Sequence, residues 1–451
     1  MTNNQPNPLP SRRVPSVAVV LLRLVVGGVF VFSGFAKAID PWGSYYKITE
    51  YVLALGWPGV AGLSLVAAVC IAAVECVLGV LLAVGAFRRS VPLLLLLLTL
   101  CLTPLTLWLA ITRAVADCGC FGDALHLGNW ATFGKNLLLL AGLCMLLWQG
   151  RHVRGWYGPA VQWIVGALTL AATLAVAWHG YFVQPLADFR PYPVGTRLAT
   201  ATADDADDYL FIYEKNGERQ EFTLDSLPDE EAGWEYVDRR PASARRAAVV
   251  ERSGHQLSLL DGGLDVTAEV LGDSSVLLIL FPDLPRVSLA HAFVINQLVD
   301  HARAHHTSVA GVTAATEQQI EHWNDLSMAA YPMLEADDSD IKMLARGNPA
   351  VVYVSQGVVQ WKRTLGSIDS HKLHAAELDP ATLGDDMDAR GTLRGILIPY
   401  AALMAALLFI NRIHLLLRRV FRREAGAPRD ADQPTPPAQP QDGQETTTAE
   451  D

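Results

Sequence analysis

Two cysteines one residue apart, Cys118 and Cys120, are the residues of this sequence best suited to chemistry. They lie in a short loop that reads Asp-Cys-Gly-Cys-Phe-Gly-Asp from residue 117 to residue 123, between two strongly apolar stretches. Two neighbouring thiols can alternate between a dithiol and a disulfide. A disulfide between residues i and i+2 closes a small ring and departs from relaxed geometry, which makes it easier to reduce. We therefore predict a redox-active pair.

Charged residues around the loop would tune these thiols. Arg113 and Lys135 flank the loop and would favour the thiolate form, whereas Asp117 and Asp123 would oppose that form. The sequence does not decide which influence is larger. Two alternatives remain for the same cysteines: a permanent disulfide that pins the loop, and a metal site. For the metal site, a zinc ion needs four ligands, and the two thiolates with His126 supply only three. We therefore assign no metal ligands.

Composition indicates a protein that is partly membrane and partly soluble. The chain has 451 residues, of which 51% are hydrophobic and 18% charged, and its net charge is −11. Acidic residues concentrate between residues 185 and 390, and an acidic domain repels phosphate, so nucleic-acid binding is excluded.

All six cysteines lie in the first third of the chain, which excludes a secreted domain held together by disulfides. The polar N-terminus precedes a long apolar stretch, and no cleavable signal peptide is expected.

Six apolar stretches are long enough to cross a bilayer, which takes about 20 residues. The predicted spans are residues 16–38, 59–86, 91–113, 135–149, 157–181 and 393–416. Clusters of arginine fall at alternate ends of these spans, at residues 12–13, 88–89, 151 and 154, and 418–423. Because cytoplasmic flanks collect positive charge, both termini are predicted to be cytoplasmic. The loops 39–58 and 114–134 and the large block 185–392 then face outward.

The first two spans carry ionisable residues on faces rich in small residues. Such side chains normally face the interior of a helix bundle. From the depths of Arg23 and Glu75, counted along each span, we predict an ion pair between them. The pair would fix the packing of the two spans or, alternatively, take part in proton or quinone chemistry. Lys37, close to the outer surface, is expected to extend toward water.

The outer block divides into a β-rich segment, residues 185–255, and an α/β segment, residues 256–392. A hairpin is predicted from strands 209–214 and 220–224 around Asn216-Gly217. Beyond it, strands and helices alternate, as in a layered α/β domain. The predicted strands are 275–281, 308–313, 350–355 and 358–362, and the predicted helices are 288–305 and 317–326. Asn348-Pro349 is a candidate cis peptide bond. The tail, 417–451, is basic and then of a composition typical of disorder.

The membrane part resembles the MauE-like and DoxX-like family, named in part for methylamine utilisation. The resemblance covers residues 16–150. It rests on Arg23-Leu-x₃-Gly27, Phe32-Ser33-Gly34-Phe35-x-Lys37, Glu75-x₃-Gly79, Cys118-Gly-Cys-Phe-Gly-Asp123 and Lys135-Asn136. It implies a four-helix bundle, with residues 157–181 and 393–416 as two further spans, and a role in thiol–disulfide traffic outside the cytoplasm. It also implies the bacterial inner membrane, with residues 1–15 and the tail cytoplasmic and the large domain in the periplasm.

The α/β segment resembles a thioredoxin-like domain, with one decisive departure. Tyr331-Pro332 and Asn348-Pro349, followed by a glycine turn, are similar to the second half of that fold. Where the family has Cys-x-x-Cys, this chain reads Phe-Pro-Asp-Leu-Pro-Arg from residue 281 to residue 286, and no cysteine follows Cys144. Dithiol chemistry by this domain is therefore excluded.

These observations predict a helical multi-pass membrane protein with an α/β outer domain. Its predicted function is thiol–disulfide exchange through Cys118 and Cys120, with a periplasmic thiol protein or a respiratory quinone as the exchange partner. The outer domain would dock partners, and membrane lipid would surround the spans. The alternative is a non-catalytic scaffold or binding protein whose Cys-Gly-Cys loop is structural. Fold resemblance alone does not choose between the two.

Overall fold

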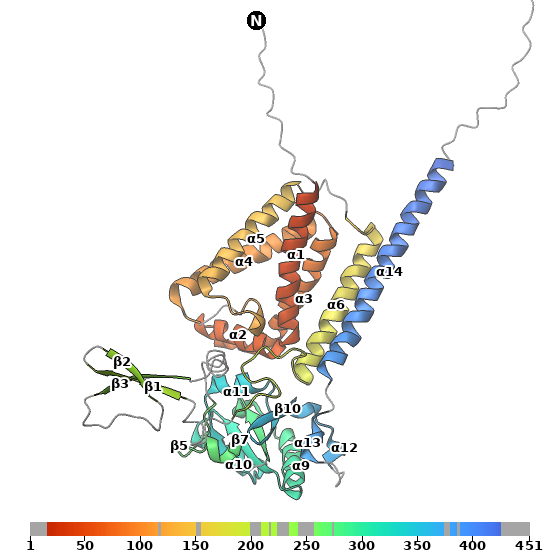
Figure 1. Cartoon of the computed structure of the whole chain (residues 1–451). Coiled ribbons are helices and arrows are strands. Elements are labelled where there is room, and N and C mark those ends of the chain that lie inside the picture. The colour runs from red at the N-terminus through yellow and green to blue at the C-terminus, as the bar shows by residue number, and fades with distance from the viewer. Residues whose placement is uncertain are drawn as a thin grey trace, which may run out of the picture.

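The computed structural model describes residues 16–115, 119–149, 155–198, 209–215, 218–222, 234–241, 257–272, 275–373, 379–385 and 388–424 (Figure 1). Within these residues, six helices are long and apolar enough to cross a membrane, so the chain is a multi-pass membrane protein. They are α1 (Ser16–Ile39), α3 (Ser64–Val84), α4 (Ser90–Thr112), α5 (Asn129–Gln149), α6 (Pro159–Phe182) and α14 (Ala389–Glu424). The predicted fold class is confirmed. The predicted disordered tail, beyond residue 424, lies outside the described residues.

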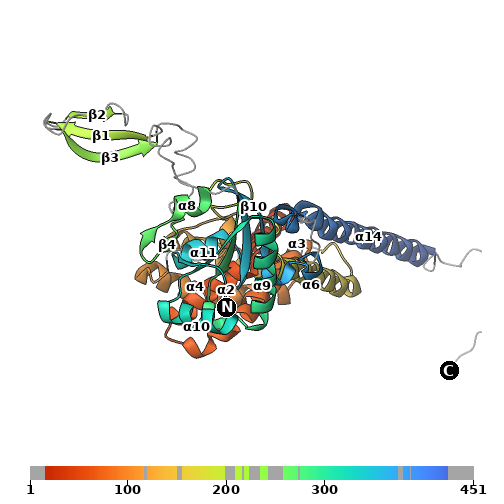
Figure 2. The same ribbon diagram turned by 90° about the horizontal axis from the view of Figure 1, so that it is seen from below.

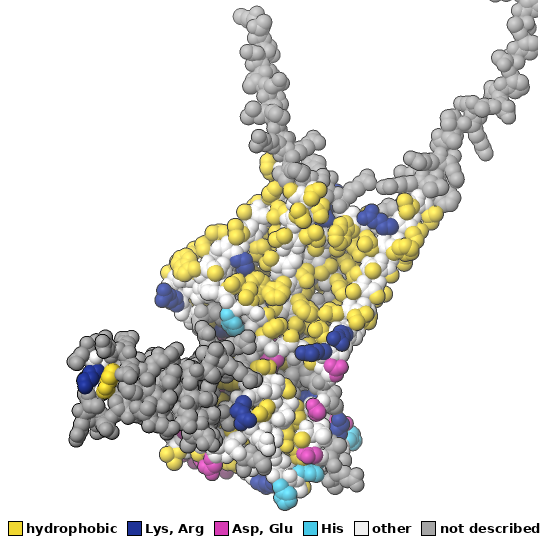
Figure 3. All heavy atoms as spheres, in the orientation of Figure 1, with side chains coloured by type: hydrophobic (Ala, Val, Ile, Leu, Met, Phe, Trp, Pro, Cys, Tyr) yellow, Lys and Arg dark blue, Asp and Glu magenta, His cyan; other side chains and the backbone are white. Residues whose placement is uncertain are grey.

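An α/β domain lies against one end of the helical part, here called the domain side (Figure 1). The opposite end of the helical part is here called the far side. Helices α1 and α6 begin there, and α14 finishes there. Hydrophobic side chains cover the helical surface between the two ends, as Figure 3 shows. Large apolar residues of α4 and α6, such as Leu97, Leu100 and Trp163, are more than half exposed. Such a surface is suited to lipid and not to water.

Helices α1, α3, α4 and α5 form the bundle, and the closest packing within it joins α1 to α3. Gly34 of α1 lies on the backbone of α3, so that a Cβ there would stand 2.6 Å from Ala72 O and Cys76 N. About two turns closer to the start of α1, Gly27 meets Gly79 in the same way. Small residues allow two helices in lipid to approach this closely. Helix α6 packs against α1 and α3 from outside, and α14 packs against α6.

A short helix that the sequence analysis missed, α2 (Pro41–Ala54), follows α1 directly on the domain side (Figure 1). Asp40 caps its start by accepting a hydrogen bond from Gly43 N at 2.9 Å, and Pro41 occupies the first turn. Trp42 of α2 stacks on Tyr181 of α6, with ring centroids 5.0 Å apart. A second short helix, η1 (Pro58–Leu63), leads into α3, and the two together form the span Pro58–Val84, close to the predicted 59–86.

The α/β domain is built on a seven-stranded mixed sheet with the order β10-β9-β6-β7-β8-β4-β5. Its strands are β4 (Leu260–Asp261), β5 (Leu264–Asp265), β6 (Ser275–Phe281), β7 (Ser308–Thr313), β8 (Met333–Glu335), β9 (Ala350–Ser355) and β10 (Val358–Thr364). Strand β6 runs parallel to β7 and antiparallel to β9. The predicted bounds of β6, β7 and β9 are confirmed, and so is the cis bond at Asn348-Pro349.

Both faces of this sheet are buried, which explains why β6 is apolar throughout. Leu278 and Leu280 point into one core cluster, while Ile279 and Phe281 point into the other with Ile295. The domain's helices are α8 (Thr267–Gly272), η7 (Leu284–Arg286), α9 (Ala290–Ala304), α10 (Glu317–Ser327), α11 (Asp338–Leu344), η8 (Leu365–Ser367), α12 (Ser370–Leu373) and α13 (Pro380–Leu383). Helix α10 begins with a capping box between Thr316 and Gln319.

A separate three-stranded sheet extends away from the α/β domain, as Figure 2 shows. It contains β1 (Tyr209–Lys215), β2 (Glu218–Phe222) and β3 (Glu235–Pro241) in the order β2-β1-β3. The predicted hairpin is confirmed, and its second strand begins at Glu218, two residues earlier than expected.

The close α1–α3 packing predicts that Gly34→Ala destabilises the bundle by about 1–3 kcal/mol, because the added methyl group meets helix backbone that cannot yield. Gly28→Ala is the matched control, since nothing lies within 4 Å of a Cβ there. Thermal unfolding of the two variants in detergent, each compared with the natural chain, measures the difference. Equal midpoints for the two variants would contradict this packing.

Candidate functional site

The described part of the Cys-Gly-Cys loop begins at Gly119 and lies on the domain side, between α4 and α5. Asp117 and Cys118 lie outside the described residues, so the roles predicted for them stay predictions. Gly119 (φ +56°) and Gly122 (φ +54°) both adopt the left-handed conformation, and Gly122 N donates to Gly119 O at 3.0 Å. Glycine is needed at both positions for this turn, which continues into η2 (Gly122–Ala124).

The carbonyl oxygen of Cys120 is held by two side chains of α1. It accepts hydrogen bonds from Ser33 Oγ and from Lys37 Nζ, both at 2.7 Å. Lys37 Nζ also lies 2.7 Å from Glu75 Oε2 on α3 and 2.7 Å from Ser33 Oγ. An ammonium group has three donors, and all three are satisfied here. The side chains of Lys37 and Glu75 are 13% and 5% exposed, so this is a buried ion pair that fixes the loop onto two helices.

The predicted Arg23–Glu75 ion pair is therefore wrong, and so is the prediction that Lys37 extends to the surface. The prediction compared depths counted along each span, but in the structure α1 and α3 pack with Gly27 beside Gly79 and Gly34 beside Cys76. As a result, Arg23 lies against Gly85 at the far side, where a Cβ on Gly85 would stand 2.0 Å from Arg23 Nη1. Glu75 lies nearer the domain side, within reach of Lys37.

Two further residues of the motif hold the loop from the α5 side. Lys135 Nζ lies 4.6 Å from the centroid of the Phe121 ring, an arrangement in which a cation is attracted to the ring face. Phe121 itself is buried and packs against Phe32 of α1 at 5.3 Å between centroids. Arg113, which ends α4 with φ +52°, is exposed. Of the two cations predicted to flank the loop, Lys135 is thus the one that contacts it in the described structure.

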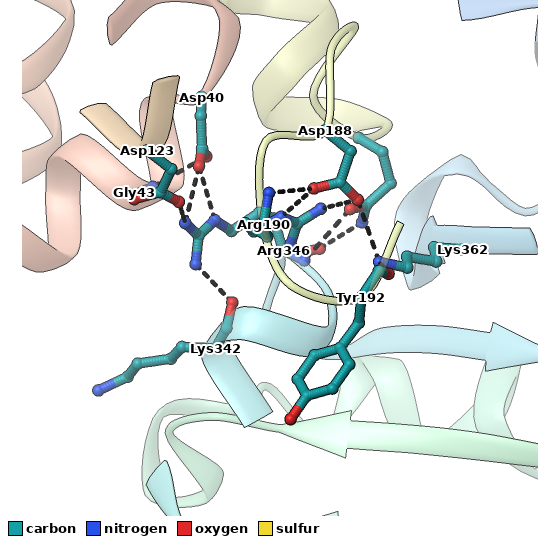
Figure 4. A network of polar contacts seen from close by, with 10 residues as sticks. Asp40, Gly43, Asp123, Asp188, Arg190, Tyr192, Lys342, Arg346 and Lys362 are labelled. Carbon is teal, nitrogen blue, oxygen red and sulfur yellow. Dashed lines mark hydrogen bonds and ion pairs between the residues drawn. The ribbon is translucent and has the colours of Figure 1, made fainter. Parts of the chain in front are cut away.

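Asp123, the last residue of the loop, joins the membrane part to the α/β domain. Its Oδ2 lies 2.5 Å from Nη2 of Arg346, whose Nε and Nη2 both lie 2.8 Å from Asp40 Oδ2 (Figure 4). Burial raises the pKa of the Asp123 carboxyl above its ordinary value, and Arg346 opposes the shift. Burial alone would lower the pKa of Arg346, but the carboxylates of Asp40 and Asp123 raise it. One guanidinium thus bridges the cap of α2, the loop and the α/β domain.

A second buried network fixes the segment that follows α6 against strand β10 (Figure 4). Asp188 accepts from Arg190 Nε at 2.7 Å and from Lys362 Nζ at 3.0 Å, and Lys362 also donates to Tyr192 O. Burial would raise the pKa of Asp188, but Arg190 and Lys362 hold it well below its ordinary range. Burial, aided by Arg190, lowers the pKa of Lys362 to about 7, although Asp188 opposes the shift.

A cavity of about 800 Å³ lies between α2, the loop and the α/β domain. Asp123 and His126 line it from the loop, and Asp283 and Arg286 line it from the segment after β6. Arg286 Nη1 lies 3.3 Å from Tyr45 OH, and Asp283 exchanges two hydrogen bonds with Asn348 at 2.8 and 3.2 Å. Three donors that line the cavity have no hydrogen-bond partner in the described structure: Tyr46 OH, Thr49 Oγ1 and Arg190 Nη1.

The fold and the site define a class: a multi-pass membrane protein whose α/β domain is fastened to one end of a helix bundle by buried ion pairs. Residues 15–149 match the family model of the methylamine utilisation protein MauE, so the bundle is a MauE family domain. Residues 208–242, which include β1 to β3, match a family described as a domain of unknown function (DUF8463). No curated protein and no solved structure matches the chain.

The structure brings together most of the motif residues that carried the resemblance. Ser33, Lys37, Glu75, Cys120 and Lys135 converge on the loop, whereas Arg23 does not. Sequence reasoning missed Asp40, Arg346 and also Lys47 of α2, whose side chain passes beside Gly119. Asp40 could have been found from the Asp-Pro signature of a helix start. Arg346 carries no local signal, since its partner Asp123 is 223 residues away.

The Lys37–Glu75 pair predicts that Lys37→Met destabilises the protein by about 3–5 kcal/mol, because it leaves the buried Glu75 carboxylate without a counter-charge. Adding Glu75→Gln should recover part of that loss. The control is Glu50→Gln, which breaks the partly exposed Lys47–Glu50 pair and should cost less than about 1 kcal/mol. Thermal unfolding in detergent measures all three. A Lys37→Met variant as stable as the control would refute the role of this pair.

The Asp188 network predicts a pH-dependent effect of Asp188→Asn on thermal unfolding. The pKa of Asp188 is lower in the folded than in the unfolded chain, so its stabilising contribution is present above the ordinary value of 3.8 and is lost as the pH falls below it. The destabilisation caused by Asp188→Asn should be full at about pH 6 and should shrink toward about pH 3. A destabilisation that stays constant over this range would count against the network.

Proposed function

We propose that this protein carries out thiol–disulfide exchange through Cys118 and Cys120, on the side of the membrane that bears the α/β domain. The MauE family domain gives the setting, a membrane bundle with the Cys-Gly-Cys loop at its domain side. The substrate is a dithiol of a partner protein, and the product is its disulfide.

The observation that carries this proposal is the placement of three lysines beside the loop at Cys120, of which Lys37 is paired with Glu75 and Lys47 with Glu50. Lys37 Nζ lies 2.7 Å from its carbonyl oxygen, and Lys135 Nζ lies 4.6 Å from the ring of the next residue. The side chain of Lys47, on α2, passes within 3.1 Å of a Cβ placed on Gly119. Arg346 offsets the charge of Asp123, one of the two acids predicted to disfavour the thiolate. Nearby cations favour the thiolate, which is the reactive form of cysteine.

The exchange balances as two half-reactions. A thiolate of the substrate attacks one sulfur of the Cys118–Cys120 disulfide, and the second substrate thiol then resolves the mixed disulfide. The substrate loses two electrons and two protons, and Cys118 and Cys120 become a dithiol. A membrane quinone or a second thiol protein takes these electrons and protons and restores the disulfide.

The α/β domain is proposed to hold the partner and not to react with it, since no cysteine follows Cys144. Its assignment as thioredoxin-like is supported by the parallel β6–β7 pair and by β9 and β10, which run antiparallel beside β6. The segment after β6, where that fold has its Cys-x-x-Cys, lines the 800 Å³ cavity together with Asp123. A partner segment entering the cavity would lie beside the loop.

We also propose the bacterial cytoplasmic membrane as the location, with the α/β domain in the periplasm and the far side facing the cytoplasm. The arginines at residues 88 and 89 follow α3 at the far side, which supports this orientation. An oxidising compartment on the domain side would allow the disulfide to persist.

A non-catalytic scaffold is the second candidate, and the Asp123–Arg346 contact favours it. In this alternative the loop serves to fasten the α/β domain to the bundle, and its disulfide is permanent. The two candidates differ in whether Cys118 and Cys120 can give up their disulfide to a substrate.

The test is a stoichiometric exchange assay on the full chain in detergent. The oxidised protein, with Cys70, Cys76, Cys101 and Cys144 replaced by serine, is mixed with a reduced dithiol peptide, and the thiols on each are counted. The proposal predicts that two thiols appear on the protein for each peptide disulfide formed. Cys118→Ser and Cys120→Ser should each abolish this transfer. No transfer from the two-cysteine protein would favour the scaffold.

A further inference from the structure

The Cys-Gly-Cys turn lies close to the cavity of about 800 Å³, yet its described residues are not part of the cavity wall. Asp123 and His126 line the cavity from the loop, whereas Gly119 and Cys120 do not. A partner dithiol that enters the cavity must therefore pass a further side chain before it reaches the turn. That side chain belongs to α2.

Lys47 of α2 contacts both the cavity and the turn. It lines the cavity, and its aliphatic stem lies over Gly119, because its Cγ, Cδ and Cβ atoms are 3.1, 3.5 and 3.6 Å from a Cβ placed on that glycine. Gly119 stands between the two cysteines in the sequence, so the stem covers the middle of the turn. One helical turn further along α2, Tyr51 packs against the same hydrophobic cluster as Cys120. Residues four apart share one face of a helix, and α2 covers the turn with this face.

The bundle holds the turn in place, whereas Lys47 is held more weakly. The carbonyl oxygen of Cys120 is fixed by Ser33 and Lys37 of α1. The ammonium group of Lys47 lies 3.3 Å from Glu50 Oε2, and the two side chains are 30% and 55% exposed. An ion pair that is hydrated to this extent is weak, and the four-carbon stem of a lysine is flexible. The stem can therefore turn away from Gly119 while the turn itself stays where it is.

We propose that Lys47 determines which dithiols reach Cys118 and Cys120, because its stem restricts the passage from the cavity to the turn. This inference rests on the proposed thiol–disulfide exchange. Cys120 is half-buried, so a small dithiol reaches the turn while the stem lies over Gly119. A polypeptide segment is broader, and it reaches the turn only after the stem has moved aside. Lys47 thus sets the selectivity between a partner protein and small thiols.

The test compares Lys47→Met with Lys47→Ala in the full chain in detergent, with Cys70, Cys76, Cys101 and Cys144 replaced by serine. Both variants lose the charge, but only Lys47→Ala loses most of the stem, so their comparison isolates the stem. Each oxidised variant reacts with a reduced dithiol peptide and, separately, with dithiothreitol. In both reactions the protein disulfide becomes a dithiol and the added dithiol becomes a disulfide. Lys47→Ala should react at least about threefold faster than Lys47→Met with the peptide, and at the same rate with dithiothreitol.

Lys342 supplies the matched control, because it lines the same cavity, pairs with Asp338 and is 29% exposed. Its Met and Ala variants should react with the peptide at equal rates. Glu50→Gln removes the ion pair of Lys47 and should speed the peptide reaction, relative to the dithiothreitol reaction, by up to about fivefold.

Two results would overturn the role of Lys47 while leaving the exchange itself intact. One is an equal peptide rate for Lys47→Ala and Lys47→Met. The other is the same gain with dithiothreitol as with the peptide, which would mean that the stem acts on the thiols and not on the passage. If the two-cysteine protein with its natural Lys47 reacts with neither reagent, the proposed exchange fails, and this inference fails with it.

Discussion

The buried ammonium group of Lys37 is the contact on which the rest of the membrane domain depends. It joins α1 to α3 through Glu75 and joins both helices to the Cys-Gly-Cys loop through the carbonyl of Cys120. A buried charge is stable in a membrane domain only when its donors are matched, and the three donors of Lys37 have three acceptors. The close contact of Gly34 with α3 brings these acceptors within reach. Packing and electrostatics therefore specify the same arrangement.

Arg346 extends this arrangement into the α/β domain. It is buried, and it shares its guanidinium between Asp40 at the start of α2 and Asp123 at the end of the loop. The loop is thus held at Cys120 by the bundle and at Asp123 by the outer domain. A partner that displaced the α/β domain would break the ion pair between Arg346 and Asp123 and so release one end of the loop. The cysteine-free domain could influence the thiols in this way.

The sequence predicted the elements well and the contacts between them less well. Spans and the buried strands β6, β7 and β9 follow from length and apolar pattern, which are local properties. Helix α2 was missed because its short, mixed pattern resembles a loop. The Arg23–Glu75 pairing failed because depth counted along each span does not determine how two helices are offset, and the contact of Gly34 with α3 sets that offset. Arg346 meets Asp123 across 223 residues, and a single sequence contains no signal for such a contact.

The most direct test of the central claim, that the loop holds a redox-active pair, is the reduction midpoint of Cys118 and Cys120. A full chain that keeps only these two cysteines, in membranes, is equilibrated across glutathione potentials and its thiols are trapped with a maleimide tag. We expect reversible titration with a midpoint near about −180 mV, as in known exchange proteins. A pair that remains oxidised below about −300 mV would be a structural disulfide and would contradict the account.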